Sequence, residues 1–341
     1  MTNAINTGVE VRQVSAATPG LESKKVAFKE IPIIDFSAIR GNDKGAKQGL
    51  GQSIYRACTE VGFFYIKNHG IEKAAMDRLL SCSRDFFSMD ELSKKSIDIS
   101  RSSFNRGYIP MYGEKNNEHS KGDLKETFDM SVEVGSDDID FLAGNPLYGP
   151  NQWPDSLPAF KSDMNAHFAL MTSLSNDIYR AFALSLGLEE SYFDSMLEKP
   201  LDILRLLRYP PQPVVEDEEQ IGTGAHSDFD CFTVLFQDPI GGLQVINSAG
   251  EWIDAPPVDG TFLINVGDMM ERWTNGLFVS TIHRVVNKSN SERYSSVFFA
   301  APNYHVQVTC LPSCQTKENP PKYSAISAGE YIVSRYEAII V

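Results

Sequence analysis

The sequence predicts a mainly β protein with flanking helices, built on an antiparallel barrel or a double-sheet jelly roll. Short apolar runs separated by Gly and Pro recur between residues 201 and 310, at the spacing typical of strands in such folds. Before residue 200, apolar residues recur at helical spacing instead. The 341 residues, 42% of them hydrophobic, are enough for one large core, and no repeat or linker divides them.

Within this single domain we predict four regions. These are a loose polar tail over 1–30, a region of helices and strands over 31–200, the jelly-roll core over 201–310, and a loop and helix over 311–341. Apolar stripes predict amphipathic helices over 47–61, 72–90, 157–186 and 329–340. Strands are expected over 203–209, 261–266, 278–286 and 294–300, whereas 95–156 is the least regular stretch.

Charge and composition restrict the partners. A net charge of −14 argues against binding to nucleic acid or to an anionic membrane surface, and no apolar run reaches the length of a membrane span. The five cysteines are scattered without a C-x-x-C pair, and no signal peptide precedes them, so we expect reduced thiols in the cytoplasm. A small molecule is the expected partner, and the oligomeric state stays open.

The pattern G-A-H-S-D at 224–228 suggests a metal site. His226 and Asp228 lie two residues apart, so on a strand their side chains point to the same side. A second histidine, His283, lies in the apolar, β-branched run 278–286. Either histidine alone is more simply read as a structural residue. Together, two imidazoles and one carboxylate form the ligand set of non-haem iron oxygenases, which leaves one face of the metal open.

A possible anion site follows on the next predicted strand. Arg293 and Ser295 lie two residues apart, and a guanidinium beside a hydroxyl is suited to hold a carboxylate. An arginine inside an apolar core is unfavourable without an anionic partner. This second pattern favours the metal interpretation of the histidines, because it predicts that a metal and a small acid bind to one core.

Several segments resemble the iron(II)/2-oxoglutarate-dependent dioxygenases of the isopenicillin-N-synthase-like group. They are IPIIDFS (31–37), VGFFYIKNHGI (61–71), RYPPQP (208–213), GGLQV (241–245) and NVGDMMERWTNGLFVSTIHRVV (265–286), and the resemblance covers about residues 31–340. It implies a double-stranded β-helix core with Fe(II) on His226, Asp228 and His283. It also implies that Arg293 and Ser295 hold 2-oxoglutarate and that Tyr209 adds a hydrogen bond. Leu207 departs from the family pattern, since many relatives have Asn there.

The implied reaction consumes O2 and 2-oxoglutarate, releases succinate and CO2, and hydroxylates, desaturates or cyclises a small organic metabolite, with ascorbate in support. Arg205 shares a strand face with Tyr209, so it either anchors a polar group of the substrate or forms a surface salt bridge. Phe299 continues the face of Ser295 and either borders the substrate or packs in the core. In the family the stretch 95–156 helps to cover the active site, so its aromatic residues either line a pocket or pin the loop to the core. These aromatic residues are Tyr108, Tyr112 and Phe128.

Two alternatives stay open. One is an iron oxidase of the isopenicillin N synthase type, which uses no oxoacid and whose Arg-x-Ser holds the carboxylate of its own substrate. The other is a non-catalytic jelly-roll receptor for a small acid, which the complete ligand set disfavours. The C-terminal helix and the stretch 95–156 are either lids or packed parts of the body.

Overall fold

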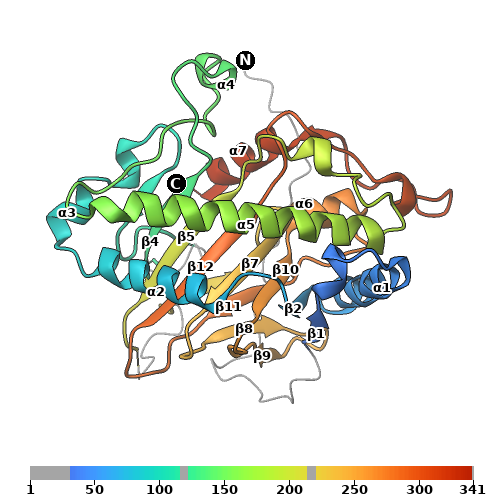
Figure 1. The fold of residues 1–341 in the computed structure, drawn as a ribbon, viewed down its shortest axis with the longest axis horizontal. Helices are drawn as coiled ribbons and strands as arrows, with labels where there is room; N and C mark the ends of the chain where they lie inside the picture. The colour runs from blue at the N-terminus through green and yellow to red at the C-terminus, as the bar shows by residue number, and fades with distance from the viewer. Residues whose placement is uncertain (1–30, 116–121, 213–219, 340–341) are drawn as a thin grey trace.

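The computed structural model describes residues 31–115, 122–212 and 220–339, so the tail predicted over 1–30 lies outside the described residues. Two sheets form the core (Figure 1). The large sheet has eight strands in the order β1 (Ile33–Asp35), β2 (Phe63–Lys67), β10 (Phe262–Val266), β7 (Phe232–Gln237), β12 (Arg293–Ala300), β5 (Ile203–Tyr209), β4 (Glu126–Ser131) and β3 (Gly107–Ile109). The small sheet has four, in the order β6 (Thr223–His226), β11 (His283–Val285), β8 (Leu243–Ile246) and β9 (Trp252–Asp254). This arrangement confirms the double-sheet core, and neither sheet closes into a barrel.

The helices α1 (Lys44–Glu60), α2 (Lys73–Phe87) and α5 (Pro158–Ser185) cover the large sheet on the side away from the small sheet (Figure 1). The other helices are α3 (Glu91–Lys95), α4 (Ile139–Leu142), α6 (Asp268–Trp273) and α7 (Ala328–Ile339). Short 3-10 turns lie at Ser37–Arg40, Ile99–Arg101, Asp194–Met196 and Pro312–Cys314, and β13 (Gln307–Val308) pairs with β14 (Ile326–Ser327). Among the described residues, no helix combines the length and the apolar character that a membrane crossing requires.

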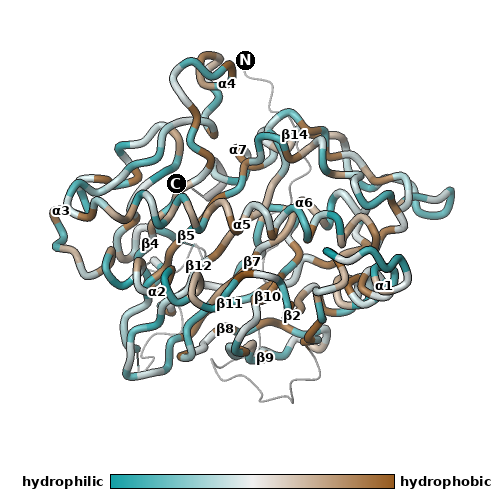
Figure 2. The backbone as a smooth tube through the Cα atoms, viewed as in Figure 1, coloured by the Kyte–Doolittle hydropathy of each residue, from teal (hydrophilic) through white to brown (hydrophobic). Residues whose placement is uncertain are grey.

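The long helix α5 lies across β5, β12 and β7 (Figure 1). Proline suits its first turn, and Gly187 follows its end with a φ of +69°, a conformation that glycine adopts without strain. Apolar and polar segments alternate along the helix in Figure 2, as expected for a helix with one buried face. Rings of that face pack on the sheet, with Phe168 and Phe298 centred 5.5 Å apart and Phe182 and Phe232 5.2 Å apart.

Alternation along β5 and β12 gives the large sheet an outer face toward the helices and an inner face toward the small sheet. On β5, Leu204 and Leu206 join the outer core, whereas Leu207 and Tyr209 join a smaller inner cluster. The register pairs Tyr209 with Arg293 and Leu207 with Ser295, so these residues share the inner face. The predicted face of β5 is therefore confirmed.

Two predicted pocket residues lie on the outer face instead. Tyr108 pairs with Phe128, which pairs with Leu206, and all three belong to the outer core. The Tyr108 hydroxyl donates a 2.6 Å hydrogen bond to Glu126, and the Phe128 ring lies 4.9 Å from that of Phe86. Their prediction as pocket residues is wrong, because the inward positions of β4 are its alternate residues. The packing alternative is correct for both.

The other differences from the predicted elements have local causes. The stretch 95–156 contributes β3 and β4, whose residues are all buried. The pattern of β4 is hard to recognise because it buries charged groups such as Glu126, which is paired with Lys94 at 2.8 Å. Tyr112 is 49% exposed in the turn after β3. Of the apolar run 278–286, only His283–Val285 forms a strand.

Candidate iron and co-substrate site

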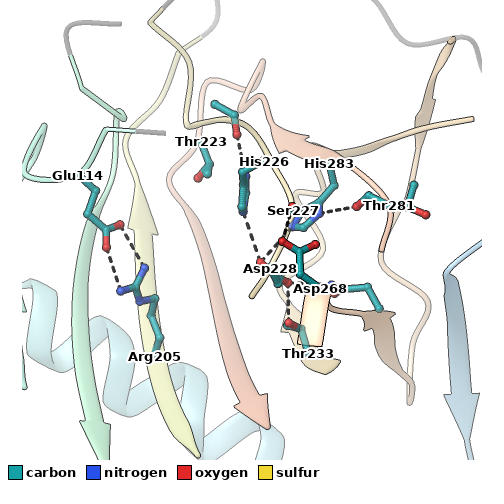
Figure 3. Close-up of polar contacts among 12 residues, drawn as sticks. Glu114, Arg205, Thr223, His226, Ser227, Asp228, Thr233, Asp268, Thr281 and His283 are labelled. Atoms are coloured by element: carbon teal, nitrogen blue, oxygen red, sulfur yellow. Dashed lines mark hydrogen bonds and ion pairs between the residues drawn. The ribbon is translucent and has the colours of Figure 1, made fainter. Parts of the chain in front are cut away.

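The three predicted metal ligands meet where the small sheet approaches β7. His226 ends β6 and pairs with His283 at the start of β11, and Asp228 follows in the loop after β6. The Asp228 Oδ1 atom lies 3.6 Å from His226 Nε2 and 3.7 Å from His283 Nε2. One ligand atom from each residue lies within 4.8 Å of the others, and Figure 3 shows the three side chains pointing toward one another. This spacing fits a single metal ion held on one face.

The remaining polar atoms of these side chains are occupied by the protein. His226 Nδ1 lies 2.8 Å from the Gly224 carbonyl oxygen, which fixes the N–H on this atom and leaves Nε2 as a ligand. His283 Nδ1 similarly faces a backbone carbonyl, at 3.2 Å. Asp228 Oδ2 accepts hydrogen bonds from Thr233 Oγ1 at 2.5 Å and Asn265 Nδ2 at 2.7 Å. Such contacts orient metal ligands, and they leave Oδ1 directed at the two imidazoles.

The ionisation states at this site also suit a metal. Burial, followed by the neighbouring His283, lowers the pKa of His226 to about 4, so its imidazole is neutral at pH 7. Burial raises the pKa of Asp228, but the two histidines and two hydrogen bonds outweigh it, and the net pKa is lowered. A neutral imidazole and an ionised carboxylate are the forms that bind metals.

Arg293 lies on the inner face and is 1% exposed. Its Nη1 donates to Ser295 Oγ at 3.1 Å, its Nη2 donates to Gln237 Oε1 at 3.0 Å, and its guanidinium lies 4.7 Å from the centre of the Tyr209 ring. Its Nε has no hydrogen-bond partner, and no carboxylate of the described residues forms an ion pair with it. A buried cation without a counter-ion is costly, so this arrangement calls for an anionic ligand.

The structure brings together the residues predicted to hold the co-substrate and adds one. Tyr209 also links the two sheets, because its hydroxyl lies 3.3 Å from Thr223 Oγ1 on the strand that ends in His226. Gln237 was not predicted. It is the cross-strand neighbour of Ser295, so only the strand pairing identifies it.

Arg205 matches neither sequence interpretation. Its guanidinium binds both carboxylate oxygens of Asp129, at 2.7 and 2.6 Å, and also contacts Glu114 at 2.9 Å. It is largely buried, so it is not a surface salt bridge, and its charge is already balanced, so it is not a free anchor for an anion. Figure 3 shows the pair of Arg205 and Glu114 on neighbouring segments beside the metal ligands. Phe299, whose ring centre is 5.7 Å from the guanidinium, lies on the same inner face.

The C-terminal helix α7 contacts the metal loop, a link that sequence reasoning missed. Ser227, between two metal ligands, donates to Asp268 Oδ2 at 3.1 Å, and the Asp268 amide donates to the Asp228 carbonyl at 2.8 Å. Arg335 of α7 lies 3.6 Å from the same Asp268 oxygen. The helix therefore packs on the body, as one of the two alternatives predicted.

Comparisons with known proteins agree with this geometry. Residues 31–156 match the family described as non-haem dioxygenase in morphine synthesis N-terminal, and residues 200–302 match the 2OG-Fe(II) oxygenase superfamily. A 2-oxoglutarate-Fe(II) type oxidoreductase, hxnY, of Emericella nidulans is 37% identical over 311 residues, which cover 90% of this chain and 89% of the relative. A homoarginine-6-hydroxylase of Glycine max is 35% identical over 325 residues, covering 90% and 96%.

Solved structures are similar as well. The full-length T7H of Neurospora crassa, in complex with alpha-KG and thymine, superposes with a TM-score of 0.80 at 33% identity, covering 90% of this chain and 96% of that one. With alpha-KG alone the TM-score is 0.81. These similarities extend over the sheets and the site, and they make the protein an oxidoreductase that uses iron(II) and 2-oxoglutarate. The chain belongs to the 2-oxoglutarate- and iron(II)-dependent oxygenases, with their double-stranded β-helix core.

Proposed function

We propose that His226, Asp228 and His283 hold the iron of this oxygenase, and that Arg293 and Ser295 hold the distal carboxylate of 2-oxoglutarate beside Tyr209. The observation that carries this assignment is the guanidinium of Arg293. It is buried, it lacks an anionic partner among the described residues, and Tyr209 connects it to the strand of His226. A dianionic co-substrate whose other end binds iron satisfies this cation.

The proposed reaction joins one oxygen atom of O2 to a carbon of the substrate and the other to 2-oxoglutarate, which leaves as succinate and CO2. Bound iron(II) supplies the activation of O2. The chain fixes the ligands, neutralises the co-substrate with Arg293, and keeps water out with apolar inner-face residues such as Leu235 and Leu263. Hydroxylation is the default outcome, and desaturation or cyclisation of the same substrate needs no further protein group.

The substrate is proposed to be a small organic metabolite. Similar structures contain thymine, 5-formyluracil or jasmonate as small molecules, with 2-oxoglutarate named beside each. The net charge of −14 supports a role without nucleic acid or an anionic membrane surface, and the scattered free cysteines favour the cytoplasm. Ascorbate is proposed as a supporting reductant.

The test compares two arginines of the paired strands β12 and β5. Arg293→Met should weaken 2-oxoglutarate binding to the iron-loaded protein by at least about 100-fold, because it removes a buried charge-assisted contact. Arg208→Met is the control, since Arg208 lies on the outer face and binds Glu126 and Glu292. Calorimetry without oxygen gives the affinities, and succinate formation gives the turnover. Equal 2-oxoglutarate affinity in the two variants would favour the oxoacid-independent oxidase, in which Arg293 holds the substrate.

A further inference from the structure

Asp230, two residues after the proposed ligand Asp228, is a buried carboxyl group that no other described side chain binds. It is 6% exposed. Among the side chains that the structure describes (31–115, 122–212 and 220–336), none forms a hydrogen bond or ion pair with this carboxyl group, whose hydrogen-bond contact is with its own backbone amide. Burial of a polar group that forms no hydrogen bond costs free energy, so such a group in a native protein calls for an explanation. A bound ligand is one explanation that can be tested.

The neighbouring acids differ from Asp230. Asp129 and Glu114 are both bound to Arg205. Asp202, which is also buried, accepts a 3.1 Å hydrogen bond from the Ala301 amide. The protein therefore satisfies the carboxylates around this position and leaves Asp230 open. This difference makes Asp230, among the described acids, the candidate for contact with a bound ligand.

The backbone brings Asp230 close to the end of β12, the strand that carries Phe299. The Cys231 amide donates to the Ala300 carbonyl at 2.9 Å, so Asp230 lies just before β7 (Phe232–Gln237) and beside the end of β12. The cross-strand partner of Phe299 is Thr233, which holds Asp228. Asp230 is also close enough to Arg205 and to Tyr336 of α7 to interact with both electrostatically. A ligand that reaches Asp230 therefore lies next to the metal ligands, with an aromatic ring and a guanidinium nearby.

The geometry of a carboxyl group restricts that ligand. Its two oxygens lie in one plane, and it pairs best with a planar group that offers two parallel contacts. An ionised carboxylate accepts two hydrogen bonds from a guanidinium. A protonated one donates its O–H to a ring carbonyl and accepts the neighbouring N–H of a cyclic amide or imide. A planar nitrogen group is therefore complementary to this carboxyl group in both protonation states, whereas a ligand carboxylate is repelled by the ionised form.

We propose that Asp230 is the substrate-recognition residue of this oxygenase, and that the substrate is a small planar nitrogen compound, a cyclic amide or imide or a guanidine, which pairs with this carboxyl group. The proposal rests on the iron and 2-oxoglutarate sites proposed above. It assigns Asp230 to binding and selectivity, and leaves the metal and the co-substrate to the other residues.

The first test needs no substrate and compares Asp230→Leu with the matched variant Asp202→Leu. Removal of an unsatisfied carboxyl group should leave the melting temperature of the iron-free protein unchanged or raise it by roughly 2 °C. Asp202→Leu should lower the melting temperature, because it leaves the Ala301 amide without its acceptor. If Asp230→Leu lowers the melting temperature as much as Asp202→Leu does, the Asp230 carboxyl group stabilises the fold, and the proposal is overturned.

The second test measures binding to protein loaded with iron(II) and 2-oxoglutarate without oxygen. The probes are thymine, L-homoarginine and 1,3-dimethylthymine, which has no N–H group. Wild-type protein should bind thymine or L-homoarginine at least about 100-fold more tightly than 1,3-dimethylthymine, since a site built for an N–H donor rejects the analogue that lacks it. Asp230→Leu should lose this difference and Asp202→Leu should keep it.

The outcomes separate this proposal from the proposed function. The Asp230 proposal is supported if the Asp230→Leu variant retains iron and 2-oxoglutarate but no longer distinguishes the probes. Wild-type protein that retains both but binds neither N–H compound, or binds the dimethyl compound equally well, overturns the substrate class while the proposed function stands. Wild-type protein that fails to bind iron or 2-oxoglutarate contradicts the proposed function itself.

Discussion

The two faces of the large sheet come from the same strands and differ in how their polar groups are paired. The outer face is packed by aromatic rings, and the buried charged network around Glu126 is fully paired. Glu126 accepts hydrogen bonds from Tyr108 and Lys94 and pairs with Arg208. The inner face has a smaller apolar cluster, and its Arg293 has a buried Nε without a hydrogen-bond partner among the described residues. Alternation lets one strand stabilise the fold with one set of side chains and bind ligands with the other.

A closed network stabilises the folded protein by itself, whereas an open one is completed by a ligand. The comparison therefore predicts opposite outcomes for substitutions on the two faces. Changes at the ligand-binding groups of the inner face should remove binding and leave the fold intact, and changes on the outer face should reduce stability without altering binding by the folded molecules.

The largest effect is expected for Asp228→Ala on the inner face. The variant loses the carboxylate ligand between two imidazoles, so iron retention should be abolished and turnover should fall at least about 1000-fold. The fold should persist, because Asp228 lies in the loop after β6 and both sheets pair without it. Iron content after gel filtration and circular dichroism measure the two properties. Retention of one iron per chain would contradict the ligand assignment.

On the outer face, Phe128→Ala should reduce the free energy of unfolding by about 3–5 kcal/mol, since it empties a fully buried site among aromatic rings. Urea unfolding measures the loss. The folded fraction should bind iron and 2-oxoglutarate as wild type does. A small stability loss with changed substrate selectivity would instead restore Phe128 as a pocket residue.

A smaller effect is expected for Asn265→Ala, which removes one of the two hydrogen bonds to Asp228 Oδ2. The change should weaken iron binding about 10- to 100-fold, the usual range for a residue that orients a metal ligand. Thr233→Val removes the other bond and should act in the same direction. Competition with a chelator gives the affinities. Unchanged affinity in both variants would show that Asp228 needs no orientation by its neighbours.

Local spacing explains what the sequence could predict. His226 with Asp228, and Arg293 with Ser295, are pairs two residues apart, so a strand alone fixes their common side, and the resemblance added His283 and Tyr209. The side of the sheet that Tyr108 and Phe128 face depends on how β4 pairs with β5. The sequence did not indicate β4 as a strand, because its buried charged residues interrupt the alternation of apolar and polar residues. Gln237 and Arg335 act through contacts with residues distant in the chain, so no local pattern marks them.

The smallest effect is expected for the charged cluster of Arg205, Glu114 and Lys125, and it concerns how protein stability depends on pH. Burial raises the pKa of Glu114, but Arg205 and Lys125 outweigh it and lower the pKa from 4.5 to about 2. The folded protein therefore binds fewer protons than the unfolded chain in this range. The stability due to Glu114 is complete above pH 4.5 and is lost as the pH falls toward 2.

Wild-type protein should accordingly lose about 1 kcal/mol more than Glu114→Gln when the pH falls from 5 to 3.5. Urea unfolding at several pH values measures both curves. Glu91→Gln is the control, since Glu91 forms an exposed pair with Lys95 and such pairs contribute little. Parallel curves for wild type and Glu114→Gln would mean that the Arg205 cluster contributes nothing that depends on pH. A steeper wild-type curve would instead show that the inner face holds paired charges that stabilise the fold, next to the open groups that await ligands.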